Sequence, residues 1–286
     1  IVDAPIERRD WMASDEDRWS DAVSPAWERY RERLFESQRD VSEQLIDLVD
    51  PRPGQTVLEL AAGPGETGLL AAERVGPSGR LISTDLGSGM VDAARRGAAE
   101  RGLANVEFRV MDAQVNDLHD RSVDAVICRF GIMLMPEPDL ALEGARRVLR
   151  DGGRLAYAVW GPPDRNPWIS MLAMAVVQTG HQPPGDPFAP GGMFSLAVPE
   201  SNTALLKSAG FTDVRTHEWP GAVRFESFDD YWTLQAAVAG PLAVLISSLT
   251  PVQVSAIHST LTPMVAPFES GGRYEFPSLA IGASAS

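Results

Sequence analysis

The chain has 286 residues, of which 44% are hydrophobic and 22% charged, and it carries a formal net charge of −14. This length supports a large hydrophobic core, and the composition excludes disordered, collagen-like and disulfide-stapled proteins. The negative charge disfavours binding to nucleic acid or to an anionic membrane surface, because both would repel the protein on average. Cys128 is the single cysteine, so no internal disulfide forms, and this favours a reducing compartment such as the cytoplasm.

No segment reads as a membrane span or a signal peptide. The most apolar stretch, residues 234–250, is interrupted by Gly240 and Pro241, which favours a pair of buried helices. The first residues are acidic and lack the charged-then-apolar layout of a secretory signal. We therefore expect a cytoplasmic protein with no membrane contact.

In the first half of the chain, the sequence pattern predicts N-terminal helices followed by alternating strands and helices. Residues 1–50 carry apolar side chains three, four and seven positions apart, which predicts helices that stop before residue 51. Alternation of strands with helices is typical of right-handed crossovers and a parallel sheet. We expect strands at 56–61, 80–86, 105–113, 123–130 and 154–160, with helices beginning near residues 66, 89 and 138.

In the second half of the chain, the sequence pattern predicts two helical insertions between strands of the same sheet. The first holds a helix at 168–179 and a proline-rich loop at 181–192, and it is followed by a helix at 200–209 and a strand at 214–219. The second is helical from 227 to 268, and a final alternating strand runs from 274 to 285.

A glycine-rich turn is the sharpest local signal. In VLELAAGPGETG, residues 57–68, an apolar strand runs into Gly63, Gly65 and Gly68 and then into a helix. Glycines let the backbone approach a ligand, and the helix start presents free amides and a positive dipole end. The same glycines, with Asp85 as a ribose-binding acid, also fit a dinucleotide site, so an NAD-dependent oxidoreductase is an alternative.

The positions of acidic residues and tyrosines bear on whether the turn binds a dinucleotide or another ligand. Glu59 precedes the turn by four residues, and a carboxylate there suits a ligand with an ammonium group better than a pyrophosphate. Asp112 adds an acid after the third strand, at the sheet edge where open α/β folds bind ligands. None of the four tyrosines has a lysine four residues later, so the usual pair of short-chain dehydrogenases is absent.

Five ordered motifs carry a family resemblance: ELAAGPGETG, TDLGSGMVDAAR, VEFRVMDAQ, VDAVICRF and VLRDGGRLAYAVW. Over about residues 50 to 160 the chain resembles the class I S-adenosylmethionine-dependent methyltransferases. The resemblance implies an α/β Rossmann-like sheet of seven strands in the order 3-2-1-4-5-7-6, with the last strand antiparallel. It also implies S-adenosyl-L-methionine as cofactor and S-adenosyl-L-homocysteine as product. The pair Pro64 and Glu66 departs from the small residues common around the second glycine.

The resemblance also implies which residues contact the cofactor. Gly63 and Gly65 would pass beneath it, Glu59 would lie near its methionine end, and Asp85 would take the ribose hydroxyls. Leu86 and Met90 would lie beside the adenine, whose amino group Asp112 would bind. The remaining expected contacts are Ala61, Ala113 and, on the methyl-donor side, Cys128, Arg129 and Phe130.

For the domains, the resemblance implies a core with additions that hold a methyl acceptor. We expect an N-terminal helical lid (1–50), the cofactor-binding core (51–160), an acceptor cap (161–199), a core strand (200–220), a helical insertion (221–270) and a last core strand (271–286). The acceptor is expected to be a small apolar or aromatic molecule. The expected acceptor-binding residues are Trp11, Trp19, Met133, Trp160, Trp168 and Tyr231.

Catalysis and partners are less constrained. His181 could act as a general base for a hydroxyl or phenol acceptor, because its ordinary pKa lies near neutrality. The four histidines and one cysteine show no metal-ligand spacing, so no metal is expected. Nothing in the sequence indicates a homo-oligomer. A protein that binds the cofactor but has lost transfer activity is a further alternative.

Overall fold

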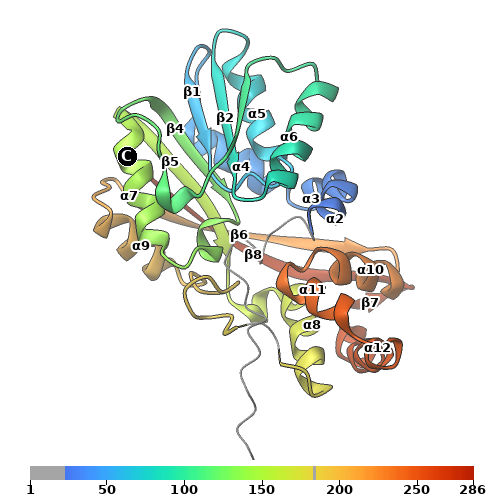
Figure 1. Ribbon diagram of the computed structural model, residues 1–286. Helices are drawn as coiled ribbons and strands as arrows, with labels where there is room; N and C mark the ends of the chain where they lie inside the picture. Colours follow the sequence, from blue (N-terminus) through green and yellow to red (C-terminus); the bar gives the residue numbers. More distant parts are fainter. Residues whose placement is uncertain (1–22, 183–184) are drawn as a thin grey trace, which may run out of the picture.

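The computed structural model describes residues 23–182 and 185–286, and its centre is one mixed β-sheet (Figure 1). The strands are β1 (Thr56–Glu59), β2 (Arg80–Asp85), β3 (Val106–Val110), β4 (Val123–Arg129), β5 (Leu149–Trp160), β6 (Arg215–Phe225), β7 (Glu269–Ser270) and β8 (Arg273–Ala285).

Helices flank the sheet. They are α2 (Ser24–Arg29), α3 (Arg31–Glu36), α4 (Arg39–Val49), α5 (Glu66–Val75), α6 (Ser88–Glu100), α7 (Pro138–Val148), α8 (Pro167–Gln178), α9 (Pro199–Ser208), α10 (Phe228–Val238), α11 (Pro241–Ser248) and α12 (Pro251–Val265). Short 3-10 turns lie at η1 (Ala113–Val115), η2 (Ile132–Leu134), η3 (Pro163–Arg165) and η4 (Ala266–Phe268).

The strand order is β3-β2-β1-β4-β5-β8-β6. β1 to β5 pair in parallel, and β8 is antiparallel to both neighbours, β5 and β6. The expected order and the antiparallel last strand are therefore confirmed. The expected count of seven is corrected to eight, because the two-residue strand β7 folds back on β8.

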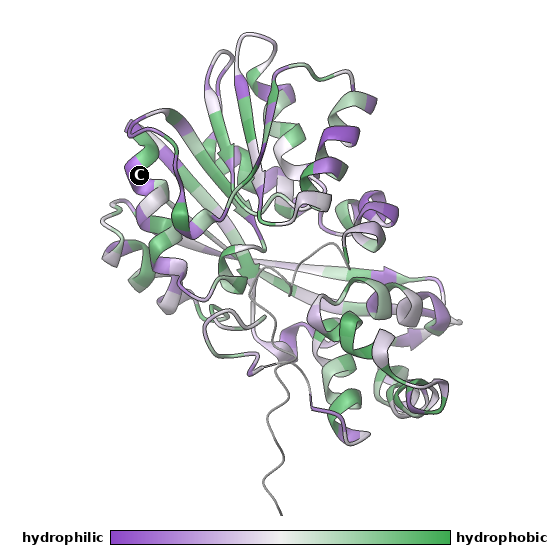
Figure 2. Ribbon diagram, in the orientation of Figure 1, coloured by the Kyte–Doolittle hydropathy of each residue, from purple (hydrophilic) through white to green (hydrophobic). Residues whose placement is uncertain are grey.

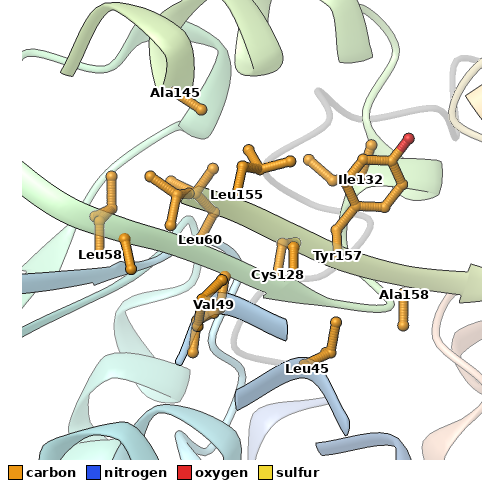
Figure 3. Packing of buried hydrophobic residues seen from close by; sticks show 14 of the residues in the cluster. Leu45, Val49, Leu58, Leu60, Cys128, Ile132, Ala145, Leu155, Tyr157 and Ala158 are labelled. Atoms are coloured by element: carbon orange, nitrogen blue, oxygen red, sulfur yellow. The ribbon is translucent and has the colours of Figure 1, made fainter. Parts of the chain in front are cut away.

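Helices cover both faces of the parallel part of the sheet. The helices α4, α5 and α6 pack on one face, while α7 and α9 pack on the other. Consecutive residues of β5 point to opposite faces: Ala158 faces Leu45 of α4, and the Tyr157 hydroxyl donates to Asn202 of α9 at 3.0 Å (Figure 3). The strands in the middle of the sheet are accordingly hydrophobic along most of their length (Figure 2).

Helix α4 belongs to this core. Its apolar stripe, Val41, Leu45, Ile46 and Val49, is buried against the sheet. Residues 39–49 are thus a structural layer, which differs from the lid that we expected over 1–50. Of the range 1–50, the structure also describes α2 and α3, and residues 1–22 lie outside the described part of the chain.

A second hydrophobic cluster lies beyond the parallel sheet. The strands β6 and β8 continue past the end of β5, and their outer halves carry Val223, Phe225 and Phe276 into a cluster with α8, α10 and α12. The helices α8 and α11 are largely hydrophobic (Figure 2). The predicted interruptions at 161–199 and 221–270 supply α8 and α10 to α12, so together they build one accessory body.

The N-terminal helices join the two bodies. On α2, the Trp27 indole donates to the Val238 carbonyl of α10 at 3.1 Å, and Glu28 pairs with Arg96 of α6. On α3, Arg33 pairs with Asp230 of α10 through both carboxylate oxygens. In the described part of the chain, no helix is long and apolar enough to cross a membrane.

Candidate cofactor and acceptor site

The candidate site lies at the carboxyl edge of the parallel strands. Because β1, β2, β4 and β5 run in the same direction, their last residues Glu59, Asp85, Arg129 and Trp160 come to one edge. These residues are far apart in the sequence, and the strand register alone brings them together.

The turn after β1 combines a tight backbone with close packing. Gly63 has φ +56°, and a Cβ there would meet no atom within 4 Å, so the space beside it is open. Gly65 has φ +88°, but a Cβ there would lie 2.7 Å from the Ala94 Cβ on α6. Gly63 therefore fits the expected close approach of a ligand, whereas Gly65 is required for helix packing and lies buried.

Ala61 holds a left-handed conformation, φ +49°, that glycine would adopt at lower cost. Its methyl group fits because residue 131 is glycine: a Cβ on Gly131 would lie 2.5 Å from the Ala61 Cβ and 2.8 Å from the Cys128 sulfur. The segments after β1 and β4 can thus pack closely because Gly131 has no side chain.

Glu59 is buried, with 2% of its surface exposed. Its carboxylate accepts the Gly68 amide at 2.7 Å and the Ser83 hydroxyl at 3.1 Å, which ties β1 to the first turn of α5 and to β2. Burial raises the pKa of Glu59 to about 8, although the bonds from Ser83 and Gly68 and the charge of Arg129 oppose this rise. The residue we placed beside the ligand turn therefore supports the turn from behind.

We predict that Glu59→Gln removes a pH-dependent loss of stability. The folded pKa of about 8 lies above the ordinary 4.5, so the wild-type protein loses stability as the pH rises between those values. The loss is about 1.4 kcal/mol per pH unit within that window, and glutamine cannot ionise. Its amide can still accept from Gly68 and donate to the Ser83 oxygen. Urea unfolding at about pH 5 and about pH 8 checks this, and parallel pH profiles of the two proteins would contradict it.

Asp85 bridges the turns that follow β1 and β2. One carboxylate oxygen accepts the Gly63 amide at 2.7 Å, and the other accepts the Gly87 amide at 2.9 Å. Burial raises the pKa of Asp85, while these backbone bonds lower it. A carboxylate has about four acceptor positions, so Asp85 can still accept from two neighbouring hydroxyl groups of a ligand.

The residues expected around the adenine also lie at this edge. Leu86 is half-buried and follows Asp85, while Met90 is 3% exposed in the first turn of α6. Asp112 caps the turn η1, where its Oδ1 accepts the Gln114 amide at 2.9 Å, and Ala113 is 7% exposed. Together, Asp85, Asp112 and Leu86 provide acceptors for hydroxyl and amino groups beside an apolar wall.

The end of β4 holds three different side chains. Cys128, an expected cofactor contact, is 2% exposed, and burial raises the pKa of its thiol to about 12, so the thiol is not a nucleophile. Arg129 is half-buried, and Phe130 follows with φ +60°. A bulky residue in that conformation is strained, and such strain concentrates at functional sites.

Phe130 begins an aromatic stack across the ends of β4 and β5. Its ring lies parallel to Trp160, with ring centroids 3.7 Å apart and an interplanar angle of 11°. Trp160 in turn meets the edge of Trp168 at 5.2 Å. Trp168 packs on both hydrophobic clusters, so the stack lies where the sheet joins the accessory helices. Trp160 is 6% exposed, so Phe130 and Trp168 present the accessible parts of this stack.

Two other expected acceptor-binding residues are buried inside the protein. Met133 is 1% exposed, and its sulfur accepts the Trp160 amide; Tyr231 is fully buried, and its hydroxyl donates to the Trp168 carbonyl at 3.0 Å. Both side chains are closed to solvent and bond to the backbone of Trp160 and Trp168. His181 follows the far end of α8, about 18 Å along the helix axis from its start, so the structure does not bring it to the stack. Trp11 and Trp19 lie outside the described residues.

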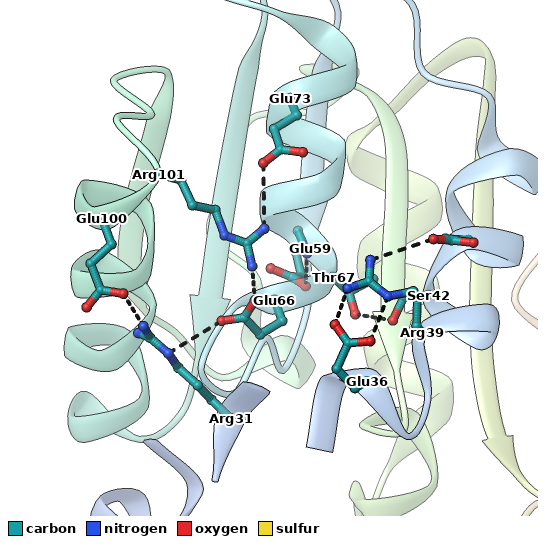
Figure 4. Close-up of polar contacts among 12 residues, drawn as sticks. Arg31, Glu36, Arg39, Ser42, Glu59, Glu66, Thr67, Glu73, Glu100 and Arg101 are labelled. Atoms are coloured by element: carbon teal, nitrogen blue, oxygen red, sulfur yellow. Dashed lines mark hydrogen bonds and ion pairs between the residues drawn. The ribbon is translucent and has the colours of Figure 1, made fainter. Parts of the chain in front are cut away.

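Sequence reasoning missed the role of Glu66, which it noted only as a departure from the family pattern. Glu66 is 4% exposed in the first turn of α5, and it pairs with Arg101 and with Arg31 of α3 (Figure 4). Nearby, the Ser42 and Thr67 hydroxyls meet at 3.0 Å and join α4 to α5. The departure from small residues at this turn is therefore explained by an ion pair that anchors α3.

Comparison with known proteins agrees with this geometry. A family model described as a methyltransferase domain matches residues 51–162. Nocamycin O-methyltransferase of Saccharothrix syringae is 32% identical over 190 residues, which cover 62% of this chain and 66% of that protein. The chain is therefore similar to methyltransferases, and residues 51–162 match a methyltransferase domain. Aklanonic acid methyltransferase DauC of Streptomyces sp. (strain C5) is 36% identical over 114 residues, covering 40% of this chain and 52% of that protein. The chain thus spans less than two thirds of the length of these relatives.

Solved structures match the fold over most of the chain. The YcgJ protein from Bacillus subtilis has a TM-score of 0.58 at 18% identity and covers 86% of this chain and 97% of that one. The [4+2]-cyclase SpnF has a TM-score of 0.55 at 18% identity and covers 86% of this chain and 80% of that one. Since one of these folds is named a cyclase, the fold by itself does not determine the reaction.

Proposed function

We propose that the protein binds S-adenosylmethionine at the carboxyl edge of β1, β2 and β4 and transfers its methyl group to a small apolar or aromatic molecule. The observation that carries this proposal is the Asp85 carboxylate, oriented by the Gly63 and Gly87 amides beside an open glycine turn. Such an acid is suited to the ribose hydroxyls of the cofactor.

The acceptor class rests on the aromatic stack. Phe130, Trp160 and Trp168 form an apolar wall next to the edge where the cofactor would bind. The names of relatives refer to nocamycin, to aklanonic acid and to ubiquinone and menaquinone biosynthesis, which supports a small organic acceptor. The net charge of −14 supports such a molecule over nucleic acid, and the single cysteine supports a cytoplasmic location.

The contribution of the chain to the reaction would be mainly positional. When bound, S-adenosylmethionine supplies an electrophilic methyl group on a sulfonium. Phe130 and Trp160 would hold the acceptor against the end of β4 and exclude water there. Holding two reactants at attack distance can contribute about 7–11 kcal/mol to the barrier reduction.

We predict that Asp85→Asn weakens S-adenosylhomocysteine binding by about 10- to 100-fold, because it removes charged acceptors for two ligand hydroxyls. Asp151→Asn is the control, since Asp151 is 83% exposed beside Arg121. Isothermal titration with S-adenosylmethionine, S-adenosylhomocysteine and NADH checks the prediction. Binding of NADH alone would replace the proposal with an oxidoreductase.

A second measurement separates transfer from binding alone. Purified protein would be incubated with methyl-labelled S-adenosylmethionine and a panel of phenolic, quinone and polyketide acceptors, and products would be detected by mass. Methylation of a panel member, reduced in the Trp160→Ala variant, supports the proposal. Tight cofactor binding with no labelled product across the panel would favour the cofactor-binding protein without transfer activity.

A further inference from the structure

The face of the sheet that carries Trp160 continues onto the edge strand β6. Trp160 of β5 and Trp219 of β6 both lie opposite Ala280 of β8, so the three side chains point to one face. Ala158, two residues before Trp160, points to the same face and lies toward Leu45 of α4 (Figure 3). The two tryptophans are two strand spacings apart, which is about 10 Å.

The Trp219 side chain leaves the next position on this face open. A Cβ on Gly282 would lie 2.3 Å from the Trp219 ring, so the ring leans over Gly282, toward the core. Gly221, two residues beyond Trp219, is exposed, and a Cβ there would meet no atom within 4 Å. Val223 follows, 3% exposed, in the accessory cluster. Open space on this face thus lies between Trp219 and Val223.

Helix α10 runs from the accessory cluster toward the core. Near its start, the Tyr231 ring packs against Phe225, which lies on the same face of β6, with centroids 5.0 Å apart. The Tyr231 hydroxyl donates to the Trp168 carbonyl at 3.0 Å. At the end of α10, the Val238 carbonyl accepts the indole of Trp27 on α2, and α2 packs on α6 of the core. The middle of α10 therefore lies between the two bodies.

Gln235 occupies the middle of α10 on its buried side. The buried residues of this helix are Tyr231, Leu234, Gln235 and Val238, which is the spacing of an apolar stripe. Gln235 is 4% exposed, its Nε2 is closed to solvent, and its side-chain amide makes no hydrogen bond to a described residue. A buried amide without a partner is unfavourable, whereas an apolar side chain would fit the stripe without that cost.

Trp168 supplies a second unpartnered donor on the element that α10 contacts. Its Nε1 is closed to solvent and has no hydrogen-bond partner among the described residues, although its carbonyl holds Tyr231, one turn before Gln235. The Trp168 ring also meets the edge of Trp160 at 5.2 Å. Two sealed donors thus lie on the two helices that the Tyr231 bond joins, next to the aromatic stack. An oxygen of a bound molecule would satisfy such a donor.

We propose that the Gln235 amide binds an oxygen of the methyl acceptor, at the end remote from the methylated position. This inference rests on the proposed function, because it assumes that the acceptor lies against the aromatic stack. A molecule that reaches from Trp160 to the open position at Gly221 must be about 10 Å long, since these residues lie two strands apart. The inference therefore names a substrate class: flat molecules of two or more fused aromatic rings with a hydroxyl or carbonyl oxygen at the far end.

The test uses two probes of the same shape. 2-Naphthol carries a hydroxyl where 2-methylnaphthalene carries a methyl group, and equilibrium dialysis with saturating S-adenosylhomocysteine measures the dissociation constant of each. Gln235→Leu should lower the preference for 2-naphthol over 2-methylnaphthalene by about 10-fold, through weaker binding of 2-naphthol alone. Gln235→Met, which keeps the length of the side chain, should lower it by a similar factor.

Controls separate this inference from the proposed function and from misfolding. Gln178→Leu makes the same change at an exposed residue at the end of α8, and it should leave the preference unchanged. Both Gln235 variants should melt at or above the wild-type temperature, since each removes an unpartnered amide from an apolar stripe. Failure of the wild type to bind S-adenosylhomocysteine would overturn the proposed function, and binding of that ligand without either probe would overturn the fused-ring acceptor class. A preference that the Gln235 variants leave unchanged, or equal losses for both probes, would overturn the role of Gln235.

Discussion

Gly68→Ala is expected to lower the free energy of unfolding by about 3 kcal/mol, although alanine normally stabilises a helix relative to glycine. Gly68 is the third residue of α5, and a Cβ there would lie 2.5 Å from the carboxylate carbon of Glu59. The Glu59 side chain would have to move, which would break its bonds to Gly68 and Ser83 inside the core. Urea unfolding monitored by circular dichroism measures the change.

A matched helix glycine provides the control. Gly144 lies inside α7, and a Cβ there would be 3.4 Å from the nearest atom, on Asn116. Gly144→Ala should therefore raise stability by about 0.5–1 kcal/mol. The double variant Gly68→Ala with Glu59→Ala should be no less stable than Glu59→Ala alone, because the overlap is gone. A Gly68→Ala protein as stable as the wild type would show that Glu59 does not fill this space.

Asn166→Ala is expected to cost about 4 kcal/mol and to loosen the start of α8. Asn166 is fully buried in the loop after β5. Its amide group donates to the carbonyls of Gly161 and Leu279 at 3.1 and 3.0 Å, and its oxygen accepts the Leu279 amide at 3.0 Å. The side chain thus extends the β5–β8 ladder beyond Trp160.

Ser278→Ala is the companion variant. The Ser278 hydroxyl donates to the same Asn166 oxygen at 3.3 Å, so its removal deletes one contact and should cost about 1 kcal/mol or less. Both variants would be compared by urea unfolding and by near-ultraviolet circular dichroism, which reports on Trp160 and Trp168. An Asn166→Ala protein within about 1 kcal/mol of the wild type would contradict the proposed bracing of this loop.

The fold could largely be predicted from the sequence because the strand and helix periods alternate clearly between residues 56 and 160. The end of β6 could not be predicted from the sequence. Pro220 and Gly221 resemble a strand stop, yet β6 continues to Phe225. β6 is the edge strand, where a residue without an amide hydrogen is tolerated because only one side of the strand is paired.

The positions of Asp85 and Arg129 at the carboxyl edge were predictable, because each residue ends a strand. The site was not predictable where a contact joins distant segments. The pairing of Arg31 with Glu66 depends on how α3 crosses α5, and the burial of Tyr231 depends on a cluster formed by the second half of the chain. No local pattern encodes either contact, since both arise from tertiary packing.

The position of β8 sets the order in which this protein can be assembled. β8 is the last strand in chain order, yet it lies between β5 and β6 and reaches both hydrophobic clusters. Neither cluster can close during synthesis until β8 has left the ribosome, so both depend on contacts of high sequence separation. Until then one edge of β5 has no partner, and an unpaired strand edge is prone to aggregation.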